Sequence, residues 1–416
     1  MSNVLIRTNR DYRLLLSASS ASNLADGVGV VALPWLATML TRDPLMIAGV
    51  ATAQRLPWLL FALPAGVWTD RIDRRLLMMR ADLVRVALMA FTVLMIISQA
   101  ALPVPDGSGP AAILSLMFIA FLFGSAEVIR DNAAQTILPS IVAQEDLERA
   151  NGQMWSAEQI TGQFIGPPVA GLLIASSVAL PFGINASIYA LSALLIWLLA
   201  LPPRKAAFAS RFLPALLEGM RWMWRNPLIL RLAIMLGAIN AVFIGGMTVL
   251  VLYAQEVLSL SATGYGLLLT FAALGGVAGG LLAPALARWL GMRHSLIAAL
   301  STFVVINLIL GLFSSPVMAG IALFCEAAAG MLWNVVTVSY RQRLIPDELL
   351  GRVNSVYRFF GWGAMPFGAM GAGALVTMLT PTIGRGDALH APYLFAAGIC
   401  GMLVTYAAMR LRFRQA

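Results

Sequence analysis

The sequence is poor in charge and in the side chains that carry most catalytic chemistry. Only 11% of its 416 residues are charged, and it contains two histidines, two cysteines and a single lysine. Hydrophobic residues make up 60% of the chain and the mean hydropathy is +0.83, whereas soluble domains are about 45–50% apolar and about 25% charged. A soluble fold would leave many of these side chains without a core to enter, so the composition indicates an integral membrane protein.

The rare residues exclude several classes of function. The phosphate loop of ATP-driven motors needs a lysine after its glycines, but Lys205 follows two prolines and an arginine. His294 and His390 are far apart in the sequence, which argues against a histidine metal site. Cys325 and Cys400 lie in apolar runs, where we expect buried thiols. Nothing resembles a nucleophile with its base, so we expect no enzyme activity, no metal and no cofactor.

The apolar residues fall into runs that are each long enough to cross a bilayer as a helix. About 20 residues span the ~30 Å hydrocarbon core, and lipid offers no water to backbone amides, so spanning segments must be helices. The first run is too long for a cleavable signal and carries Asn23 and Asp26. The twelve expected spans are residues 14–39, 45–69, 77–101, 111–131, 153–177, 183–201, 229–254, 264–289, 294–314, 317–340, 354–379 and 391–411. The sequence thus predicts an all-α integral membrane fold.

A polar stretch divides these spans into two sets of six. We expect residues 1–201 and 229–416 to form two six-helix bundles, joined by a cytoplasmic linker, 202–228, that forms an amphipathic helix on the inner membrane face. The halves also resemble each other, because "RAN" at Arg149–Asn151 and "RVN" at Arg352–Asn354 open the fifth and eleventh spans. A repeat of half the chain fits two parallel bundles.

The basic residues indicate the orientation. Of the 28 lysines and arginines, all but Arg42, Arg55 and Arg385 are assigned to the two tails and to the connections after even-numbered spans; Arg85 and Arg130 are counted there. Because basic residues stay on the cytoplasmic side, we expect both termini in the cytoplasm. The net charge of +9 then reflects membrane topology. Nucleic-acid binding is disfavoured, since the charges are spread over short, separate loops.

The connection between the second and third spans, "GVWTDRIDRR", carries an ordered motif. Its residues are Gly66, Asp70, Arg71, Arg74 and Arg75. The pattern resembles the signature loop of the major facilitator superfamily, G-x-x-x-D-R-x-G-R-R, with Asp73 in place of the usual glycine. The resemblance implies a conformational latch between the bundles.

The physical properties of these residues suit a latch. Gly66 permits close helix approach, Asp70 can cap a helix N-terminus, and the arginines can pair with acids such as Asp131, the expected partner of Arg74. An ordinary solvated loop would explain the arginines but not the spacing of Gly66 and Asp70. The second half has Pro284 where the acid would stand, so the latch would act from one side only.

The fifth span contains "GQFIGPPVAG", which resembles the G-x-x-x-G-P-x-x-G-G motif of antiporter branches of the superfamily. Gly162 and Gly166 make a face of small residues for close packing, Pro167 bends the helix, and the final glycine pair is reduced to Ala170 and Gly171. The motif favours export over uptake. A kinked, glycine-rich packing helix is the alternative interpretation.

The segment "LIPDELLGRVNSV" resembles an exporter subfamily that includes siderophore exporters, macrolide efflux proteins and actinobacterial multidrug pumps. The resemblance covers essentially the whole chain. It implies the major facilitator fold of twelve helices, a bacterial inner-membrane location, and transport by rocking two bundles around a midplane site. We expect a monomer that has no nucleic-acid partner.

Charges inside the spans are candidates for proton coupling, because an ionisable group in the bilayer is costly unless it is paired or hydrated. Asp26 and Arg55 lie at similar depths in the first two spans, so we expect them to pair, with Asp26 carrying the proton. A static structural pair is the alternative. Glu326, in the tenth span, is the second candidate. Glu127 and Glu158 are expected to pair with loop arginines.

Polar, methionine and aromatic side chains in the central spans suit a loosely held amphipathic ligand. The expected lining residues are Asn23, Gln54, Gln159, Gln163, Asn240, Trp333, Asn334, Trp362 and Met365. Packing against protein or lipid is the alternative role for each of them.

The sequence therefore predicts an exporter of amphipathic small molecules or drugs, driven by the proton gradient. Export of an endogenous product such as a siderophore, or flipping of a lipid, remains open within the same fold. A membrane receptor would be expected to carry a large signalling tail, and an integral-membrane enzyme would need a histidine or acid cluster in the spans.

Overall fold

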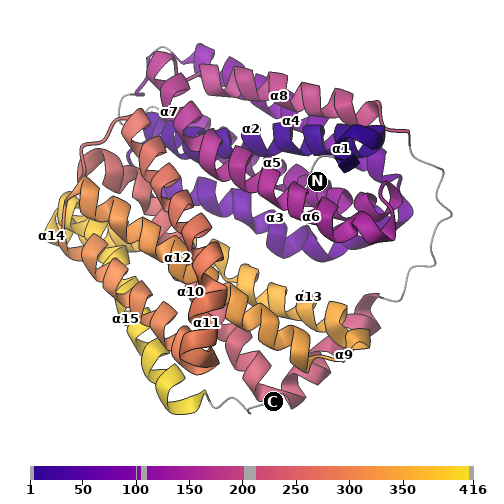
Figure 1. The fold of residues 1–416 in the computed structure, drawn as a ribbon. Helices are drawn as coiled ribbons and strands as arrows, with labels where there is room; N and C mark the ends of the chain where they lie inside the picture. Colours follow the sequence, from indigo (N-terminus) through magenta and orange to yellow (C-terminus); the bar gives the residue numbers. More distant parts are fainter. Residues whose placement is uncertain (1–3, 100, 105–109, 201–211, 412–416) are drawn as a thin grey trace. The chain divides into compact units, whose positions relative to one another are not determined.

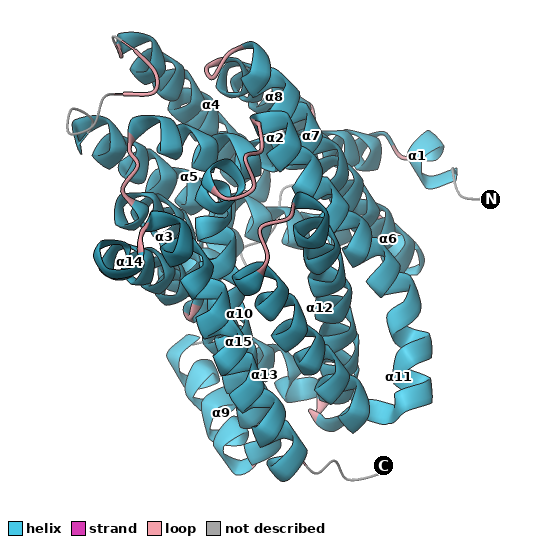
Figure 2. Cartoon of the chain, turned by 90° about the vertical axis from the view of Figure 1, so that its left-hand side faces the viewer, coloured by secondary structure: helices cyan, strands magenta, loops and turns pink. Residues whose placement is uncertain are grey.

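The computed structural model of the chain describes residues 4–99, 101–104, 110–200 and 212–411. Within these residues all regular structure is helical, with short connections between the helices (Figures 1 and 2). Before the linker the helices are α1 Val4–Thr8, α2 Arg10–Leu40, α3 Pro44–Arg71, α4 Arg74–Ser98, α5 Pro110–Ile137, η1 Leu138–Ser140, η2 Gln144–Asp146, α6 Leu147–Glu158, η3 Gln159–Ile165, α7 Gly166–Ser176 and α8 Leu180–Trp197. After it they are α9 Phe212–Arg225, α10 Pro227–Glu256, α11 Ala262–Leu312, α12 Pro316–Leu344, α13 Asp347–Gly363, α14 Met365–Ile383 and α15 Arg385–Arg410.

Nine helical stretches of the described residues are long and apolar enough to cross a membrane. Large apolar side chains also face outward, such as Leu281 and Trp289, which are 78% and 81% exposed. Such surfaces suit contact with lipid, so the chain is a multi-pass membrane protein. The number of twelve spans stays a prediction.

Four predicted spans differ from simple helices. The eighth and ninth follow each other directly in α11, where the chain turns at Gly291. Its φ of +71° lies in the left-handed region that glycine adopts without strain. The fifth span is divided into α6, η3 and α7, and the eleventh into α13 and α14, because prolines follow each break and remove backbone donors.

The described chain forms two compact units. Unit 1 comprises residues 1–42, 53–210 and 262–267. Within it, α2 packs against α6, η3, α7 and α8, and α4 packs between α5 and α8. The first turn of α11 belongs here too, and the ring of Tyr265 lies 6.2 Å from that of Trp35 on α2. Helix α2 is therefore the central element of unit 1.

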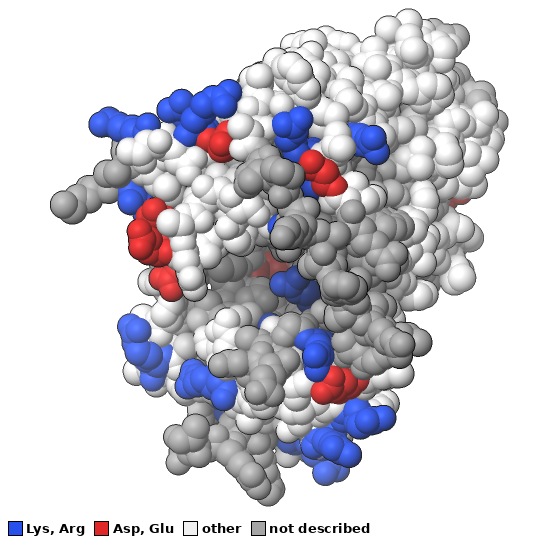
Figure 3. Space-filling view, turned by 90° about the vertical axis from the view of Figure 1, so that its right-hand side faces the viewer, with Lys and Arg blue, Asp and Glu red and all other residues white. Residues whose placement is uncertain are grey.

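Unit 2 comprises residues 43–52, 211–261 and 268–416. Helix α10 packs against α13, α14 and α15, and α9, which lies in the predicted linker, packs on α13 and α10. The start of α3 belongs to this unit, where Ala48 meets Gly373 on α14 so closely that a Cβ on the glycine would clash. Residues 202–211 of the predicted linker lie outside the described residues. Figure 3 shows basic side chains, in blue, at the surface, with acidic side chains, in red, beside some of them.

Candidate functional site

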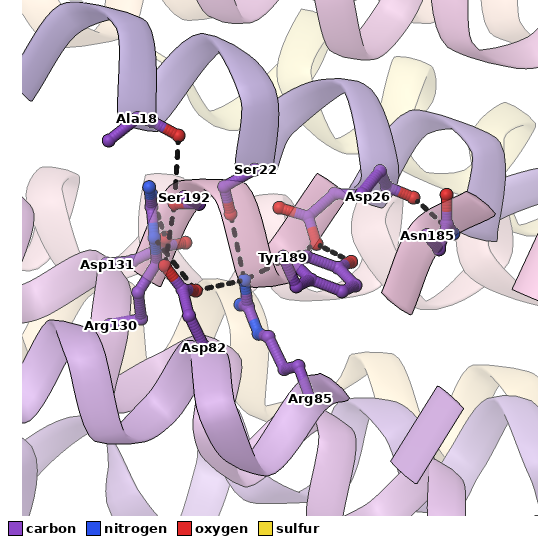
Figure 4. Close-up of polar contacts among 11 residues, drawn as sticks. Ala18, Ser22, Asp26, Asp82, Arg85, Arg130, Asp131, Asn185, Tyr189 and Ser192 are labelled. Atoms are coloured by element: carbon purple, nitrogen blue, oxygen red, sulfur yellow. Dashed lines mark hydrogen bonds and ion pairs between the residues drawn. The ribbon is translucent and has the colours of Figure 1, made fainter. Parts of the chain in front are cut away.

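A network of charged side chains lies buried among four helices of unit 1 (Figure 4). Its members, here called the charge network, are Asp26 on α2, Asp82 and Arg85 on α4, and Arg130 and Asp131 on α5. Helix α8 adds the hydroxyl groups of Tyr189 and Ser192. Asp82, Arg85 and Arg130 are buried, whereas Asp26 and Asp131 are partly exposed.

Arg85 is the centre of the network. Its Nη1 lies 3.6 Å from Asp26 Oδ1 and 3.6 Å from Asp82 Oδ1 and donates to Ser22 Oγ at 3.0 Å. The guanidinium is fully buried, with its Cζ 5.2 Å from the ring centroids of both Phe123 and Tyr189. One nitrogen atom thus forms ion pairs with carboxylates from two different helices.

Arg130 extends the network along α5. Its Nε lies 3.6 Å from Asp82 Oδ1 and its Nη1 3.8 Å from Asp131 Oδ1. The Asp82 carboxylate is fully buried, and Ser192 donates to its Oδ2 at 2.7 Å. The two arginines therefore share one buried carboxylate.

Asp26 and Asp131 are the two partly exposed acids of the network, at 27% and 34%. The side chains of Asp82 and Arg85 are 0% exposed. Tyr189 donates to Asp26 Oδ1 at 2.8 Å, and Asn185, one turn earlier on α8, donates to the Ala25 carbonyl at 2.9 Å. These bonds fix α2 against α8 at the depth of Asp26.

The network contains one more acid than base. Three carboxylates (Asp26, Asp82 and Asp131) face two guanidiniums (Arg85 and Arg130), so one negative charge is left without a cationic counterpart. Several buried network atoms, including Asp82 Oδ1 and Arg85 Nη2, also make no hydrogen bond within the described chain. Buried polar atoms without a hydrogen-bond partner cost free energy.

The predicted pairing of Asp26 with Arg55 is wrong. Asp26 pairs with Arg85, while Arg55 on α3 acts electrostatically on Glu127 of α5. Two residues at a similar depth in the membrane do not pair for that reason alone, because the side of the helix from which each side chain projects decides its partner.

The assignment of Arg85 and Arg130 to cytoplasmic loops is also wrong. Arg85 lies about 16 Å along α4 from Arg74, at the 1.5 Å rise of a helix, and Arg130 is 2% exposed. Asp82 was missed altogether. The available signal was its spacing of three residues from Arg85, which places the two side chains on one helix face.

The glycine motif of the fifth span lies against α2, directly beside Asp26. A Cβ on Gly27 would come 2.0 Å from the Gly162 carbonyl oxygen, and one on Gly166 would come 2.6 Å from Gly27 Cα. Gly162 lies in η3, which ends just before Gly166 and is a π-helix, a form often found at functional sites. Pro167 opens α7, where its ring and missing N–H disturb the preceding helical turn. Gly171 meets the backbone of Ala262.

The latch motif is described only in part. The surroundings of Gly66 and the side chains of Asp70 and Arg71 are not among the features that the structure describes. Arg74 donates to the Thr136 carbonyl on α5, and Arg75 donates to the Leu199 carbonyl, after α8, at 2.6 Å. Both arginines thus bind the start of α4 to neighbouring segments of unit 1, and the pairing of Arg74 with Asp131 stays a prediction.

Asp73, the departure from the signature pattern, has a clear structural role. It is the N-cap of α4, and its Oδ1 accepts hydrogen bonds from the backbone of Arg75 at 2.8 Å and of Leu76 at 3.4 Å. A glycine could not accept these bonds. The aspartate therefore satisfies two of the helix's free amides.

The predicted substrate-binding residues of unit 1 lie on three elements. Asn23 is on α2, Gln54 is on α3 with its carbonyl against Gly124, and Gln159 and Gln163 are on η3. Gln163 is exposed and Gln159 is half-buried. Gln159 and Gln163 therefore belong to the π-helical segment that contacts Gly27.

The remaining predicted substrate-binding residues belong to unit 2. Asn240 on α10 donates to the Gly361 carbonyl at 2.8 Å, next to the half-buried Trp362, and Met365 opens α14. Asn334 is exposed. Trp333 is only 1% exposed, so the prediction that it lines an open cavity does not hold here; its large ring fills the packed side of α12.

Glu326 differs from the acids of unit 1. It lies within α12, and its carboxylate makes no hydrogen bond or ion pair with another residue of the described chain. The thiol of Cys400 on α15 is close enough to sense its charge. Among the described residues, no group of three or more histidines, cysteines or acids has the geometry of a metal site.

Comparisons with known proteins identify the family. The family model described as transmembrane secretion effector matches residues 7–412. The chain is 27% identical over 379 residues to the multidrug efflux pump Tap of Mycolicibacterium fortuitum (87% of this chain, 88% of Tap). It is 26% identical over 419 residues to the enterobactin exporter EntS of Escherichia coli strain UTI89 (99% and 95%). A point mutant of the nucleoside transporter NupG shares the fold, with a TM-score of 0.79 at 12% identity over 96% of this chain and 100% of that one. The chain therefore belongs to the transmembrane secretion effector family of the major facilitator superfamily, and it is a membrane transporter related to efflux proteins.

Proposed function

We propose that this protein is a secondary active exporter, which moves amphipathic small molecules outward in exchange for protons. The family and the relatives named as a multidrug efflux pump and an enterobactin exporter support the direction of transport. The proton gradient is the energy source, and no cofactor is needed. Alternating access between two six-helix bundles, residues 1–201 and 229–416, is the proposed mechanism.

We further propose twelve membrane spans with both termini in the cytoplasm of a bacterium, and a monomer in its inner membrane. The distribution of arginines along the sequence supports this orientation. Burial of Arg85 and Arg130 removes two charges from the cytoplasmic set but leaves its excess intact.

The observation that carries the proposal is the position of Arg85 Nη1 between Asp26 and Asp82. With three carboxylates around two guanidiniums, the charge network accommodates one proton without leaving an arginine unpaired. Asp26 is the proposed carrier, because it is partly exposed and, unlike Asp131, contacts the central Arg85 directly. Glu127, Glu158 and Arg55 also act electrostatically within this region and set its total charge.

Protonation of Asp26 would act on α2. A neutral carboxyl no longer attracts Arg85, which keeps Asp82 and Ser22 as partners. The next residue, Gly27, is the point at which α2 touches Gly162 and Gly166 of the fifth predicted span. A small movement of α2 would therefore reach η3, whose π-helical turns are a natural place for helix geometry to change.

The proposal is tested with proteoliposomes that contain a pH-sensitive dye and an imposed proton gradient. Lipophilic cations, macrolides, tetracyclines and aromatic acids are added one at a time. We expect at least one compound to accelerate collapse of the gradient in liposomes with the protein and not in empty ones. Transport of a labelled compound that never alters the proton gradient would overturn proton exchange.

A further inference from the structure

Unit 2 contains two arginines that lie against aromatic rings. Arg341, in the last turn of α12, has its Cζ 3.7 Å from the centroid of the Tyr357 ring on α13. Arg358, one residue further along α13, has its Cζ 5.6 Å from the ring of Trp362. Each guanidinium thus has an aromatic neighbour, an arrangement that favours the cation.

Neither arginine has an acidic partner among the described residues. The hydrogen bond of Arg341 is a long one, from Nε to the Thr337 carbonyl at 3.4 Å in its own helix. The positive charge of Arg358 acts on Arg341, so the two guanidiniums repel each other. Elsewhere in unit 2, Arg352 pairs with Glu218 and Arg385 with Glu256. Among the side chains that the structure describes, no acid therefore compensates the pair Arg341 and Arg358, here called the arginine pair.

General rules explain only part of this arrangement. A cation in the last turn of a helix interacts favourably with the helix dipole, which accounts for Arg341 and its neighbour Arg343. Arg358 lies well inside α13 (Asp347–Gly363), where the dipole gives it no such stabilisation. The rule that basic residues stay on the cytoplasmic side requires only arginines in solvent. It does not explain why Arg341 is half-buried.

The surroundings hold the arginine pair in place. Tyr357 is 1% exposed and its hydroxyl lies 3.4 Å from the Leu232 carbonyl on α10. Asn240 donates to the Gly361 carbonyl, next to Trp362. A guanidinium stacked on a ring keeps its N–H groups directed along its edges, where they can donate to two oxygens of an anion. Asn334, exposed and two turns before Arg341 on the same side of α12, adds an amide.

We propose that Arg341 and Arg358 bind the anionic group of an amphipathic small molecule, such as a carboxylate, sulfonate or phosphate on an aromatic body. Trp362 and the exposed ring of Phe359 would receive the apolar part. Identification of this molecule as the exported substrate rests on the proposed function. Proton and substrate then bind in different units, the proton at the charge network and the anion at the arginine pair.

The test measures binding to the purified full-length protein in nanodiscs of phosphatidylcholine, with no gradient present. Three ligands share one ring system and differ in charge: 1-naphthoate, 1-naphthamide and 1-naphthylmethylammonium. Calorimetry is expected to show 1-naphthoate binding about tenfold more tightly than 1-naphthamide, as one or two charge-assisted hydrogen bonds would give. The ammonium compound should bind most weakly.

Variants assign this preference to the arginine pair. Arg358→Gln changes an exposed side chain and should fold normally, and it is expected to abolish the preference for 1-naphthoate. Arg341→Gln should do the same, and Arg358→Lys should keep part of it, because lysine has the charge without the planar fork. Arg343→Gln, an exposed arginine on the same helix, is the matched control and should bind like wild type. Equal affinity for naphthoate and naphthamide in wild type, or unchanged preference in both glutamine variants, would overturn the site.

One further arm separates the possible explanations. Naphthoate binding is measured without a proton gradient, so a failure of proton coupling does not affect this result. Native mass spectrometry of protein purified with phosphatidylglycerol shows whether the anion is instead a lipid headgroup. Loss of a retained lipid in Arg358→Gln, together with no naphthoate binding by wild type, would assign the arginine pair to a lipid and overturn the soluble ligand.

Discussion

The two units differ in how the charged side chains discussed above are paired. In unit 1, Asp26, Asp82 and Arg85 share contacts at 3.6 Å, and Arg130 joins them from α5. In unit 2, Glu326 has no described partner, and the arginine pair faces no described acid. Paired charges inside a membrane protein hold helices together and respond to a proton, whereas unpaired ones are available to a ligand. The difference is consistent with the proposal that energy coupling belongs to unit 1 and substrate binding to unit 2.

The largest expected effect comes from removing the centre of the charge network. Arg85→Met leaves Asp82 buried without its nearest cation, and breaking a buried pair in this way costs about 3–5 kcal/mol. Thermal unfolding in detergent should show a lowered midpoint, while the control Arg288→Met, which changes an exposed arginine on α11, should not. Equal midpoints for Arg85→Met and wild type would mean that unit 1 does not depend on its pairing.

A steric change tests whether the network is connected to the fifth predicted span. Gly27→Ala adds a Cβ 2.0 Å from the Gly162 carbonyl oxygen, so the helices must separate, at a cost of about 1–3 kcal/mol. Gly29→Ala is the matched control on the same helix, because its Cβ would meet nothing within 4 Å. We expect Gly27→Ala to lower both stability and transport. If Gly27→Ala transports at the same rate as Gly29→Ala, the contact between α2 and the fifth predicted span has no part in transport.

A smaller effect is expected where unit 1 departs from the signature motif. Asp73→Ala removes the N-cap of α4 and should cost about 1 kcal/mol. Asp73→Ser should restore most of the stability, because a hydroxyl oxygen also accepts from the helix amides. Chemical denaturation of the three proteins measures the difference. If alanine and serine behave alike, the cap contributes nothing at this position.

The smallest effect is expected from removing a carboxylate charge in unit 2. Glu326→Gln removes no described hydrogen bond or ion pair, so the free energy of unfolding should change by less than about 1 kcal/mol. Asp82→Asn, the equivalent change in unit 1, should cost clearly more, because Arg85 and Arg130 both lose a partner. Similar losses for the two variants would contradict the difference between the units.

The helical membrane fold was predictable because it follows from local properties. Runs of apolar residues require helices in lipid, and Asp26 stood out as the acid of such a run. The partners of Asp26 were not predictable in the same way, because they depend on how α2, α4 and α8 rotate against each other. Arg85 was assigned to a positively charged loop and Asp82 was not considered, although their spacing places them on one helix face.

The glycine motif shows the same limit. The spacing of Gly162 and Gly166 predicted a face for close packing, but nothing local identified Gly27 as its partner. The π-helix η3, which ends just before Pro167 and Pro168, was likewise not evident from the sequence pattern. The arginine pair was missed because Arg341 and Arg358 were counted as topology signals.

The central claim is that Asp26 couples transport to protons, and one measurement on Asp26→Asn tests it directly. Proteoliposomes with wild type or variant are assayed in parallel for substrate-dependent proton flux and for exchange of labelled against unlabelled substrate across the membrane. Asp387→Asn, an acid in the first turn of α15, serves as the control. The account predicts that Asp26→Asn keeps substrate exchange and loses proton flux, because the binding residues remain while the carrier does not. Proton flux that continues at the wild-type rate in Asp26→Asn would contradict it.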